Sequence, residues 1–368
     1  MDFSNQSQHS GNNSTQVQID SVNNTFNIVN GIDESRARVI CREEYQIERQ
    51  KLSSEAKLIA DTRVQQLEDR LMPKMIALDN SLKMFANPNF LFILRKAQLS
   101  ALLSEKESDY DILSELLVHR VEQQNNKERC LGIHKAIDIV PMISDSALVG
   151  LTIFYVLLNF IPRSSDIRLG LSVLDNLYQK ILEKIRLPKG SEWLEHLELL
   201  SAIRIDSSGV NSLKKFDEFI PLLLSDYLIS GIDKNSKEYL EIKNKFEKED
   251  IPTQLITQNP LKLGNVYLNI PSDIDELEIV SPDGTKRLIK LNERQRNTIK
   301  EVRPILNCIE KSPELKKELV KMCNSFSCLK LVKDWWDQIP LSFRITPAGT
   351  ALANAYAHGK DSKIPISY

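Results

Sequence analysis

The stretch from Glu34 to Leu71 constrains the fold more than any other part of the sequence, because it contains neither proline nor glycine and is densely charged. Apolar residues recur in it at spacings of three, four, five and seven, which indicates a helix with a thin apolar stripe. No strict heptad is present, so a regular coiled coil is not indicated. At about 1.5 Å per residue such a helix would exceed about 50 Å. We expect residues 32–74 to form a long stalk helix that packs on a neighbour.

A short β-forming strip precedes this helix. Val17 and Ile19 alternate with polar residues, and Phe26 and Ile28 repeat the alternation after an Asn-Asn turn signal. Two strands this short are marginal in water and need a surface to cover their apolar face. We therefore expect residues 1–31 to be an oligomerisation strip with these four apolar side chains as its dry core. A hairpin that lies on the body of its own chain is the alternative.

The remaining chain divides where its composition changes. Residues 75–250 carry repeated amphipathic periods between caps and stops, which predicts an α-helical domain with a core of leucine and isoleucine. Prolines and glycines become frequent after residue 250, and the alternation at Leu277–Val280 leads into an Asp-Gly turn. Residues 251–368 are therefore expected to form a small α+β lobe. The predicted fold class is mainly α: a helical-bundle body with a short N-terminal β-hairpin or solenoid strip, a long stalk helix and that lobe.

One apolar run, Ala147–Ile161, is the place to look for a membrane segment. A membrane span needs about 20 such residues, and Asp145 and Pro162 bound this run on its two sides. We expect a helix buried on all sides of a soluble core. A membrane-disrupting segment that is released on activation is the alternative, although we do not expect a membrane partner.

The charge balance and the cysteine content indicate the cellular compartment in which the protein is expected. The 48 basic and 50 acidic residues nearly cancel, so no global field draws the chain to nucleic acid or to an anionic membrane. The five cysteines are scattered without a CxxC pair, which fits a reducing compartment better than a disulfide framework. The first fifteen residues lack the charged and apolar regions of a signal peptide. We expect a cytoplasmic protein.

Motifs that carry chemistry are missing from the sequence. It has no GxxxxGK[ST] or GxGxxG phosphate loop, no HExxH zinc motif and no GxSxG nucleophile elbow. The five histidines never pair at helical spacing. We therefore predict no catalytic residue, no metal site and no cofactor, and expect a protein that is not an enzyme.

A basic segment offers one route to nucleic acid. Seven cations gather here against only two carboxylates, and three of them would share one helix face. They are Lys286, Arg287, Lys290, Arg294, Arg296, Lys300 and Arg303. A solvated helix face is the expected explanation, and phosphate contact is the alternative.

The C-terminal box is the last informative segment. Thr346 is a natural N-cap, and Pro347 suits the first helical position. The small residues that follow allow close helix packing, and Ile345 with Leu352 keeps a pattern seen at the end of winged-helix domains. We expect a docking C-terminal helix rather than a DNA-reading wing.

The two ends of the chain together resemble a known family. The prefix Gly11–Gln18, the helix start Glu34–Arg38 and the closing box Ile345–Ala353 are similar to an uncharacterised bacterial family of LPO/Vpar type, as are the middle segments Ser100–Val121 and Leu148–Leu158. Similar Asn-rich prefixes occur on proteins of phage-defence systems. The resemblance implies an oligomeric protein associated with bacterial immunity, and it carries no catalytic residues to transfer.

These observations lead to three functional hypotheses. The first is a self-assembling interaction or sensor protein of bacterial anti-phage defence, whose partners are its own copies and an unidentified protein partner or phage trigger. The second is a membrane-disrupting effector that uses the apolar helix at residues 147–161. The third is a nucleic-acid-binding protein that uses the basic segment at residues 286–303.

Overall fold

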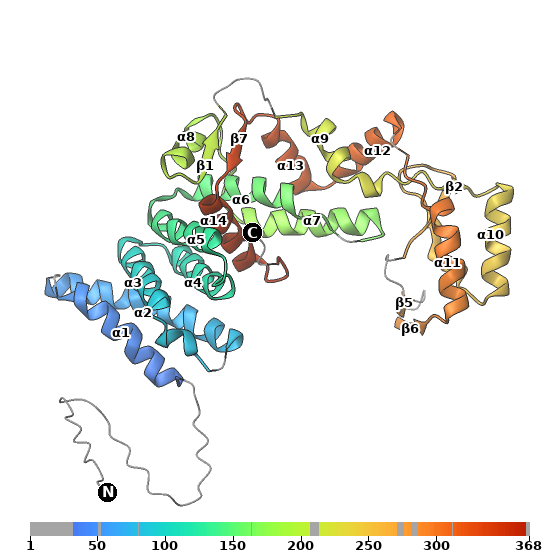
Figure 1. Cartoon of the computed structure of the whole chain (residues 1–368). Coiled ribbons are helices and arrows are strands. Elements are labelled where there is room, and N and C mark those ends of the chain that lie inside the picture. The colour runs from blue at the N-terminus through green and yellow to red at the C-terminus, as the bar shows by residue number, and fades with distance from the viewer. Residues whose placement is uncertain are drawn as a thin grey trace, which may run out of the picture.

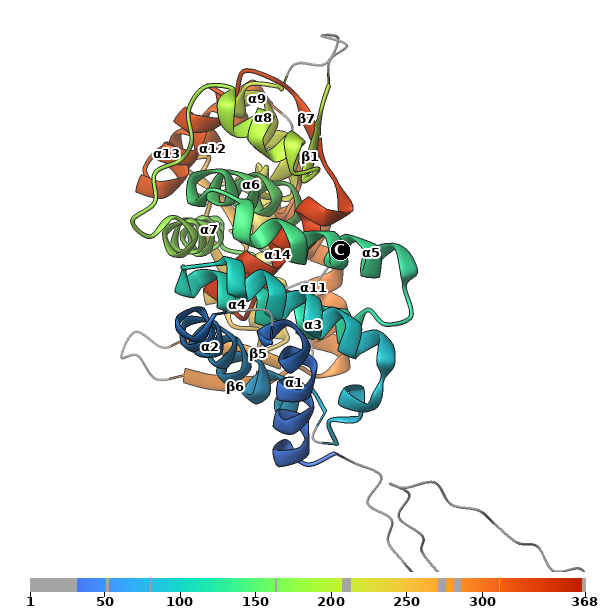
Figure 2. The same ribbon diagram turned by 90° about the vertical axis from the view of Figure 1, so that its left-hand side faces the viewer.

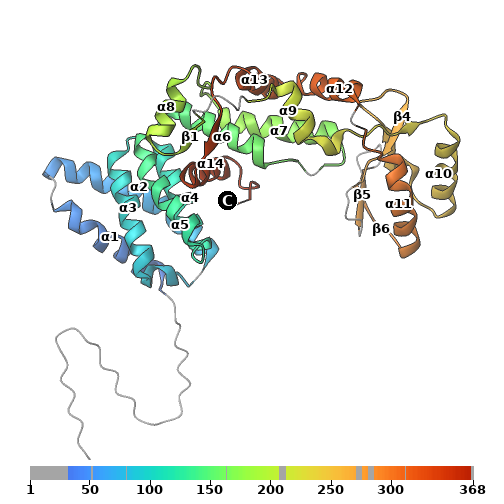
Figure 3. The ribbon, with the colours of Figure 1, turned by 45° about the horizontal axis from the view of Figure 1, so that its top comes forward.

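In a computed structural model, the structure describes residues 32–50, 53–79, 81–162, 164–206, 213–270, 276–280, 286–310 and 312–365. The chain is mainly helical, as the sequence predicts (Figure 1). A large helical body occupies one end of the molecule, and a small lobe that contains most of the strands occupies the other (Figures 1 and 3). The predicted strip at residues 1–31 lies outside the described residues.

The predicted single stalk helix is wrong, because two helices occupy this stretch. Helix α1 spans Glu34–Arg49 and α2 spans Ser54–Leu78. The Ser53 side chain accepts a hydrogen bond from the Ala56 amide and so begins α2. The helices form an antiparallel hairpin: Arg49 pairs with Asp61 near its tip at 2.8 Å, and Arg38 pairs with the buried Glu68 farther down at 3.0 Å. Helix α2 continues through Pro73.

The body continues with helices that surround one large hydrophobic core. The α-helices are α3 (Pro88–Leu103), α4 (Glu107–Glu122), α5 (Lys127–Ile139), α6 (Asp145–Asn159), α7 (Ile167–Leu182), α8 (Glu192–Leu199), α9 (Phe216–Leu223), α12 (Pro313–Cys323), α13 (Ser327–Trp336) and α14 (Pro347–Lys360), with 3-10 turns at Lys83–Ala86, Val140–Met142 and Ser225–Tyr227. Helix α14 lies in the middle of the body and packs on α4, α5 and α6 (Figure 2). The last helix of the chain therefore joins elements that precede it by some 200 residues.

The lobe has its own smaller core, which is built around α10 (Lys237–Lys248) and α11 (Glu293–Leu306). Its sheet has the order β2-β4-β3, and all pairs in it are antiparallel. The strands are β2 (Ile232–Asp233), β3 (Ile256–Gln258) and β4 (Asn265–Leu268), with a 3-10 turn at Thr253–Leu255. The predicted hairpin is confirmed as β5 (Glu276–Val280) paired with β6 (Lys286–Lys290).

Packing moves both boundaries of the predicted C-terminal lobe. The chain enters and leaves the lobe through two antiparallel segments, joined by the Ile229–Ile309 bridge and by the Ser230 amide, which donates to the Cys308 carbonyl at 2.8 Å. Residues before position 251, such as those of α10, belong to the lobe core. Residues after position 312 return to the body. The lobe is therefore an insertion in the helical body between α9 and α12.

A two-stranded antiparallel sheet closes the body on one side. Strand β1 (Ile203–Ile205) pairs with β7 (Phe343–Ile345), although about 140 residues separate them in the sequence. The predicted cap at Thr346 is confirmed, since its side chain accepts from the Gly349 amide at 3.2 Å and Pro347 begins α14. Gly349 has to be glycine, because a Cβ there would lie 2.0 Å from the Ala202 carbonyl oxygen. The close approach fixes α14 against β1.

Candidate functional site

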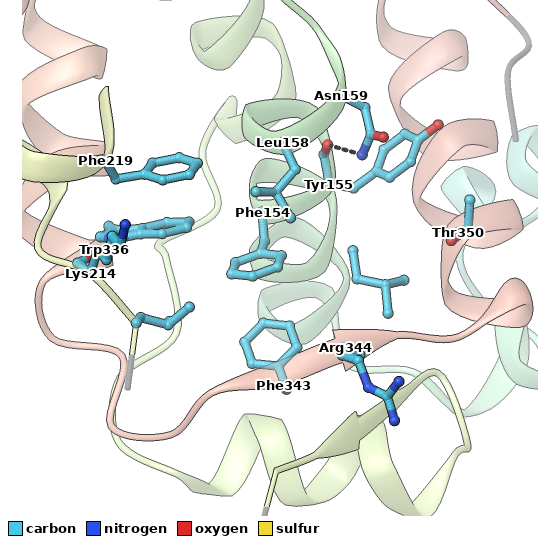
Figure 4. Close-up of a pocket in the computed structure, with 12 residues that line it drawn as sticks. Phe154, Tyr155, Leu158, Asn159, Lys214, Phe219, Trp336, Phe343, Arg344 and Thr350 are labelled. Carbon is cyan, nitrogen blue, oxygen red and sulfur yellow. Dashed lines mark hydrogen bonds between the residues drawn. The ribbon is translucent and has the colours of Figure 1, made fainter. Parts of the chain in front are cut away.

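A cavity among the described residues lies beside β7, where elements distant in sequence meet. It has a volume of about 720 Å³ and opens to solvent. Helix α6 forms its back wall, β7 its lower edge and the start of α14 its right-hand wall in Figure 4. Its lining residues are Phe154, Tyr155, Leu158, Asn159, Leu213, Lys214, Phe219, Trp336, Phe343, Arg344, Ile345 and Thr350.

Stacked aromatic rings give the cavity a firm apolar wall. Trp336 stacks on Phe219 with centroids 4.9 Å apart and on Phe154 at 5.2 Å, with an interplanar angle of 12° in both pairs. The Phe343 ring lies 4.2 Å from Phe154 (Figure 4). The Trp336 indole N–H donates to the Lys214 carbonyl at 2.8 Å, which ties the stack to the segment before α9. Such pairs stabilise one another beyond the area they bury, so this wall is preorganised.

The register of the small sheet decides which backbone groups of β7 face the cavity. The Asp206 amide donates to the Ser342 carbonyl at 2.9 Å, and the Thr346 amide donates to the Ala202 carbonyl at 3.0 Å. Hydrogen-bonded pairs alternate along an antiparallel ladder, so Arg204 and Arg344 form the bonded pair between these two. The N–H and C=O groups of the intervening residues of β7 must point away from β1, toward the cavity.

These groups belong to Phe343 and Ile345, and no hydrogen-bond partner for them lies within the described part of the chain. The opposite edge of the sheet differs. On β1 the Ile205 amide donates to the Glu198 carboxylate at 2.8 Å, so α8 covers that edge. Among the described residues the sheet therefore has one covered edge, on β1, and one edge without a hydrogen-bond partner, on β7; we call the latter the open edge, and it borders the apolar cavity.

Three cations flank this edge. Arg204 and Arg344 lie directly opposite each other on the outer face of the two strands, and Lys214 lies at the cavity. All three are exposed, and none of their side chains has a hydrogen bond or ion pair with a described residue. None of the described residues that line the cavity is a carboxylate. Like charges directly opposite in a sheet repel each other, so this face favours an anionic neighbour.

The predicted basic segment lies elsewhere, in the lobe. Lys286, Arg287 and Lys290 belong to β6, while Arg294, Arg296, Lys300 and Arg303 lie on α11. The helix carries carboxylates among its cations, and one of them, Glu301, pairs with Lys245 of α10 at 2.7 Å. Partial burial lowers the pKa of Arg303. The structure therefore brings four of the predicted cations onto one helix beside acidic neighbours.

The predicted oligomerisation residues Val17, Ile19, Phe26 and Ile28 lie outside the described residues. The predicted apolar helix is confirmed as α6, which is buried from Ala147 to Leu157 within the body core. Its last turns supply the back wall of the cavity. No helix in the described part of the chain is long and apolar enough to cross a membrane.

A buried polar cluster joins α2, α4 and α14 on another side of the body. Lys74 Nζ lies 2.8 Å from the Glu115 carboxylate, and His119 and His358 lie within 3.9 Å of the same carboxyl group. His119 is fully buried, and this burial lowers its pKa to about 3, with the charges of His358 and Lys74 acting in the same direction. No group of three potential ligands in the described ranges is arranged to hold a metal ion. The cluster therefore links α2, α4 and α14 through polar contacts.

Comparison with known proteins identifies the family. A model of a Vpar-type protein family matches residues 31–367. The chain belongs to this family. The match covers the body and the lobe together, whereas residues 1–30 lie outside it. No curated protein and no solved structure matches the chain. The functional proposals for this Vpar-type chain therefore rest on its sequence and its own structure.

The sequence did not reveal the open edge or the cavity of this Vpar-type chain. Of the residues at this cavity, the sequence pattern singled out Ile345 alone, as part of the segment expected to dock the C-terminal helix. A visible signal was the triplet Phe343-Arg344-Ile345, in which one exposed cation separates two large apolar residues before the helix cap. That alternation is typical of a strand, and its partner β1 is too distant in sequence to be recognised.

Proposed function

We propose that this chain is a non-enzymatic, self-assembling interaction protein of bacterial defence, and that its body binds an extended polypeptide segment at the open edge of β7. The observation that carries the proposal is the combination of unpaired backbone groups on Phe343 and Ile345 with an aromatic cavity beside them. Either feature alone would have a simpler explanation. Together they match the needs of an added strand.

Strand addition uses two kinds of contact. Backbone hydrogen bonds to the exposed edge contribute affinity, and pockets for alternate side chains contribute specificity. Each net hydrogen bond contributes about 0.5–1.5 kcal/mol. Two residues of β7 offer outward N–H and C=O groups, and the cavity accepts the apolar side chains of an incoming strand. Edge strands left uncovered are a hazard in natural proteins, so a bound segment would also protect this one.

Self-assembly through the N-terminal strip is the second part of the proposal. Val17, Ile19, Phe26 and Ile28 would bury a face that a lone ribbon leaves exposed. The defence role is supported by the resemblance of the Asn-rich prefix to prefixes on proteins of phage-defence systems, and the closing TPxGxALA segment supports the likeness to the family alone. In such a protein the body would act as the sensor or recruitment surface.

Light scattering after size exclusion tests the self-assembly. We expect the full chain to have a larger mass than one protomer and a chain that starts at residue 33 to have the mass of one. Ile19→Asp in the full chain should lower the mass, whereas Gln18→Asp, which places the same charge on the opposite strand face, should change it less. Equal masses for the full and truncated chains would contradict self-assembly through the strip.

A further inference from the structure

We propose that the segment bound at the open edge of β7 is the chain's own strip at residues 16–21, supplied by a second copy of the chain. The inference rests on the proposed function, because it names the partner of the site described there. Three observations support it: the alternation of apolar and polar residues in the sequence of the strip, the cations of the sheet that form no ion pair with a described residue, and the position of α1, which follows the strip, relative to β7.

The face patterns of the two segments match. On β7, the Phe343 and Ile345 side chains share the more buried face of the strand, while the exposed Arg344 side chain lies on the other face at the rim of the cavity. In a strand formed by the strip, Val17 and Ile19 would share one face while Gln18 and Asp20 would share the other. Both apolar pairs have a spacing of two residues, so one register places Val17 and Ile19 beside the β7 pair in the aromatic cavity.

The same register brings a carboxylate to the cations. With Gln18 opposite Arg344, Asp20 lies diagonal to it on the outer face, within reach of a long side chain. Arg204 lies opposite Arg344 on β1 and forms no ion pair with a described residue. Two carboxylates lie near it in the chain: that of Glu198 accepts the Ile205 amide, and that of Asp206, directly after β1, forms no ion pair with either arginine. Asp20 is the one charged residue between Met1 and Ile32 apart from Asp2, so it is the natural partner for this pair.

The position of α1, which follows the strip in the chain, favours a strip that is supplied by a second copy. Helix α1, which follows the strip, lies at the end of the body opposite to β7 in both Figure 1 and Figure 2. The eleven residues from Ser21 to Gly31 span at most about 40 Å when fully extended. A strip supplied by a second copy needs no such stretched path. Because the donor and acceptor surfaces differ, the contact is heterologous and produces either a closed ring or a growing filament.

A charge exchange in the full chain tests the inference by light scattering. Arg344→Glu places two acidic groups at the interface, and we expect it to weaken assembly by about fivefold or more, since an exposed ion pair is lost and a repulsion is gained. Adding Asp20→Arg to the same chain restores an opposite-charge pair and should recover the wild-type mass profile. Lys234→Glu, which reverses an exposed cation of the lobe, is the matched control and should leave the mass unchanged.

A peptide titration separates the two proposals. The peptide Ser14–Asn24 is added to full chain that carries Ile19→Asp and cannot supply its own strip, and tryptophan fluorescence reports on Trp336 in the cavity. Saturable binding that is lost in the peptide with Val17→Asp supports the inference. If Ile19→Asp dissociates the chain but Arg344→Glu has no effect and the peptide does not bind, the strip assembles elsewhere and the inference fails while self-assembly stands. A monomeric wild-type chain would overturn both. Circular dichroism of each variant establishes that it is folded.

Discussion

Burial of His119 should make the body of this protein lose stability in mild acid. The side chain is fully buried, and its pKa in the folded chain is about 3, against about 6.5 for an unfolded chain. Below pH 6.5 the His119 ring therefore binds a proton in the unfolded state, whereas in the folded state it stays neutral until the pH approaches 3. Stability is complete above the unfolded pKa and decreases as the pH falls toward the folded one.

The magnitude at pH 5 is nearly independent of the exact folded pKa. Linkage gives a loss of about 2 kcal/mol between pH 7.5 and pH 5, because the unfolded histidine is then about 1.5 pH units below its pKa. A folded pKa anywhere below about 4 leaves this value almost unchanged. Glu115 lies 3.9 Å from His119 and would favour the charged ring, but Lys74 already pairs with that carboxylate at 2.8 Å. Desolvation therefore dominates.

Urea unfolding of the wild type and of His119→Gln measures this effect. Trp193, Trp335 and Trp336 all lie in the body core, so tryptophan fluorescence follows the relevant unit. We expect the wild type to lose about 2 kcal/mol more than the variant between pH 7.5 and pH 5, and the two to change in parallel between pH 7.5 and pH 8.5. An equal acid loss in both chains would show that His119 is not held neutral, and the argument from burial would be refuted.

Three further perturbations test the packing and the alternative functions. Gly349→Ala should destabilise the body by about 1–3 kcal/mol in urea unfolding, since its Cβ would lie 2.0 Å from the Ala202 carbonyl oxygen; Gly359→Ala in the same helix has room and should be neutral or stabilising. The full chain should not shift duplex DNA or RNA at about 150 mM salt, and a shift that Lys300→Glu weakens would instead favour the nucleic-acid hypothesis. The folded chain should release no dye from anionic vesicles at neutral pH, because α6 is buried in the core; leakage would favour the membrane hypothesis.

Local patterns predicted the elements of this fold well. The apolar run at Ala147–Ile161, the hairpin predicted from the alternation at Leu277–Val280 and the cap at Thr346 all correspond to elements of the structure. Each depends on residues close together in sequence, such as a capping hydroxyl or an Asp-Gly turn. The prediction of a single stalk helix was wrong although the sequence contains Ser53, which is a good N-cap. Ser53 begins a second helix because the chain folds back there, and Tyr45 of α1 then packs on Ala60 and Val64 of α2. That long-range contact cannot be recognised from the local sequence.

Long-range pairing set the limit of prediction. The lobe boundaries depend on the Ile229–Ile309 bridge, and the small sheet of the body depends on the pairing of β7 with β1. Neither pairing can be recognised from a local stretch of sequence, because the paired segments lie far apart in the chain. The candidate site has the same origin, since its wall combines Phe154, Phe219 and Trp336 from three separate helices. Its residues were visible in the sequence, but their proximity was not.

The corner between β7 and α14 explains why an open edge can be kept ready for a partner. The Thr346 hydroxyl lies 2.7 Å from the Ser201 carbonyl and accepts the Gly349 amide, while α5 approaches so closely that a Cβ on Gly132 would lie 2.8 Å from the Pro347 carbonyl. The strand is thus held from both sides before anything binds. The ordering cost of association then falls on the incoming segment alone. A segment with only two apolar side chains to bury offsets little of that cost, so a single strip should bind weakly and stable assembly should need a closed ring of copies.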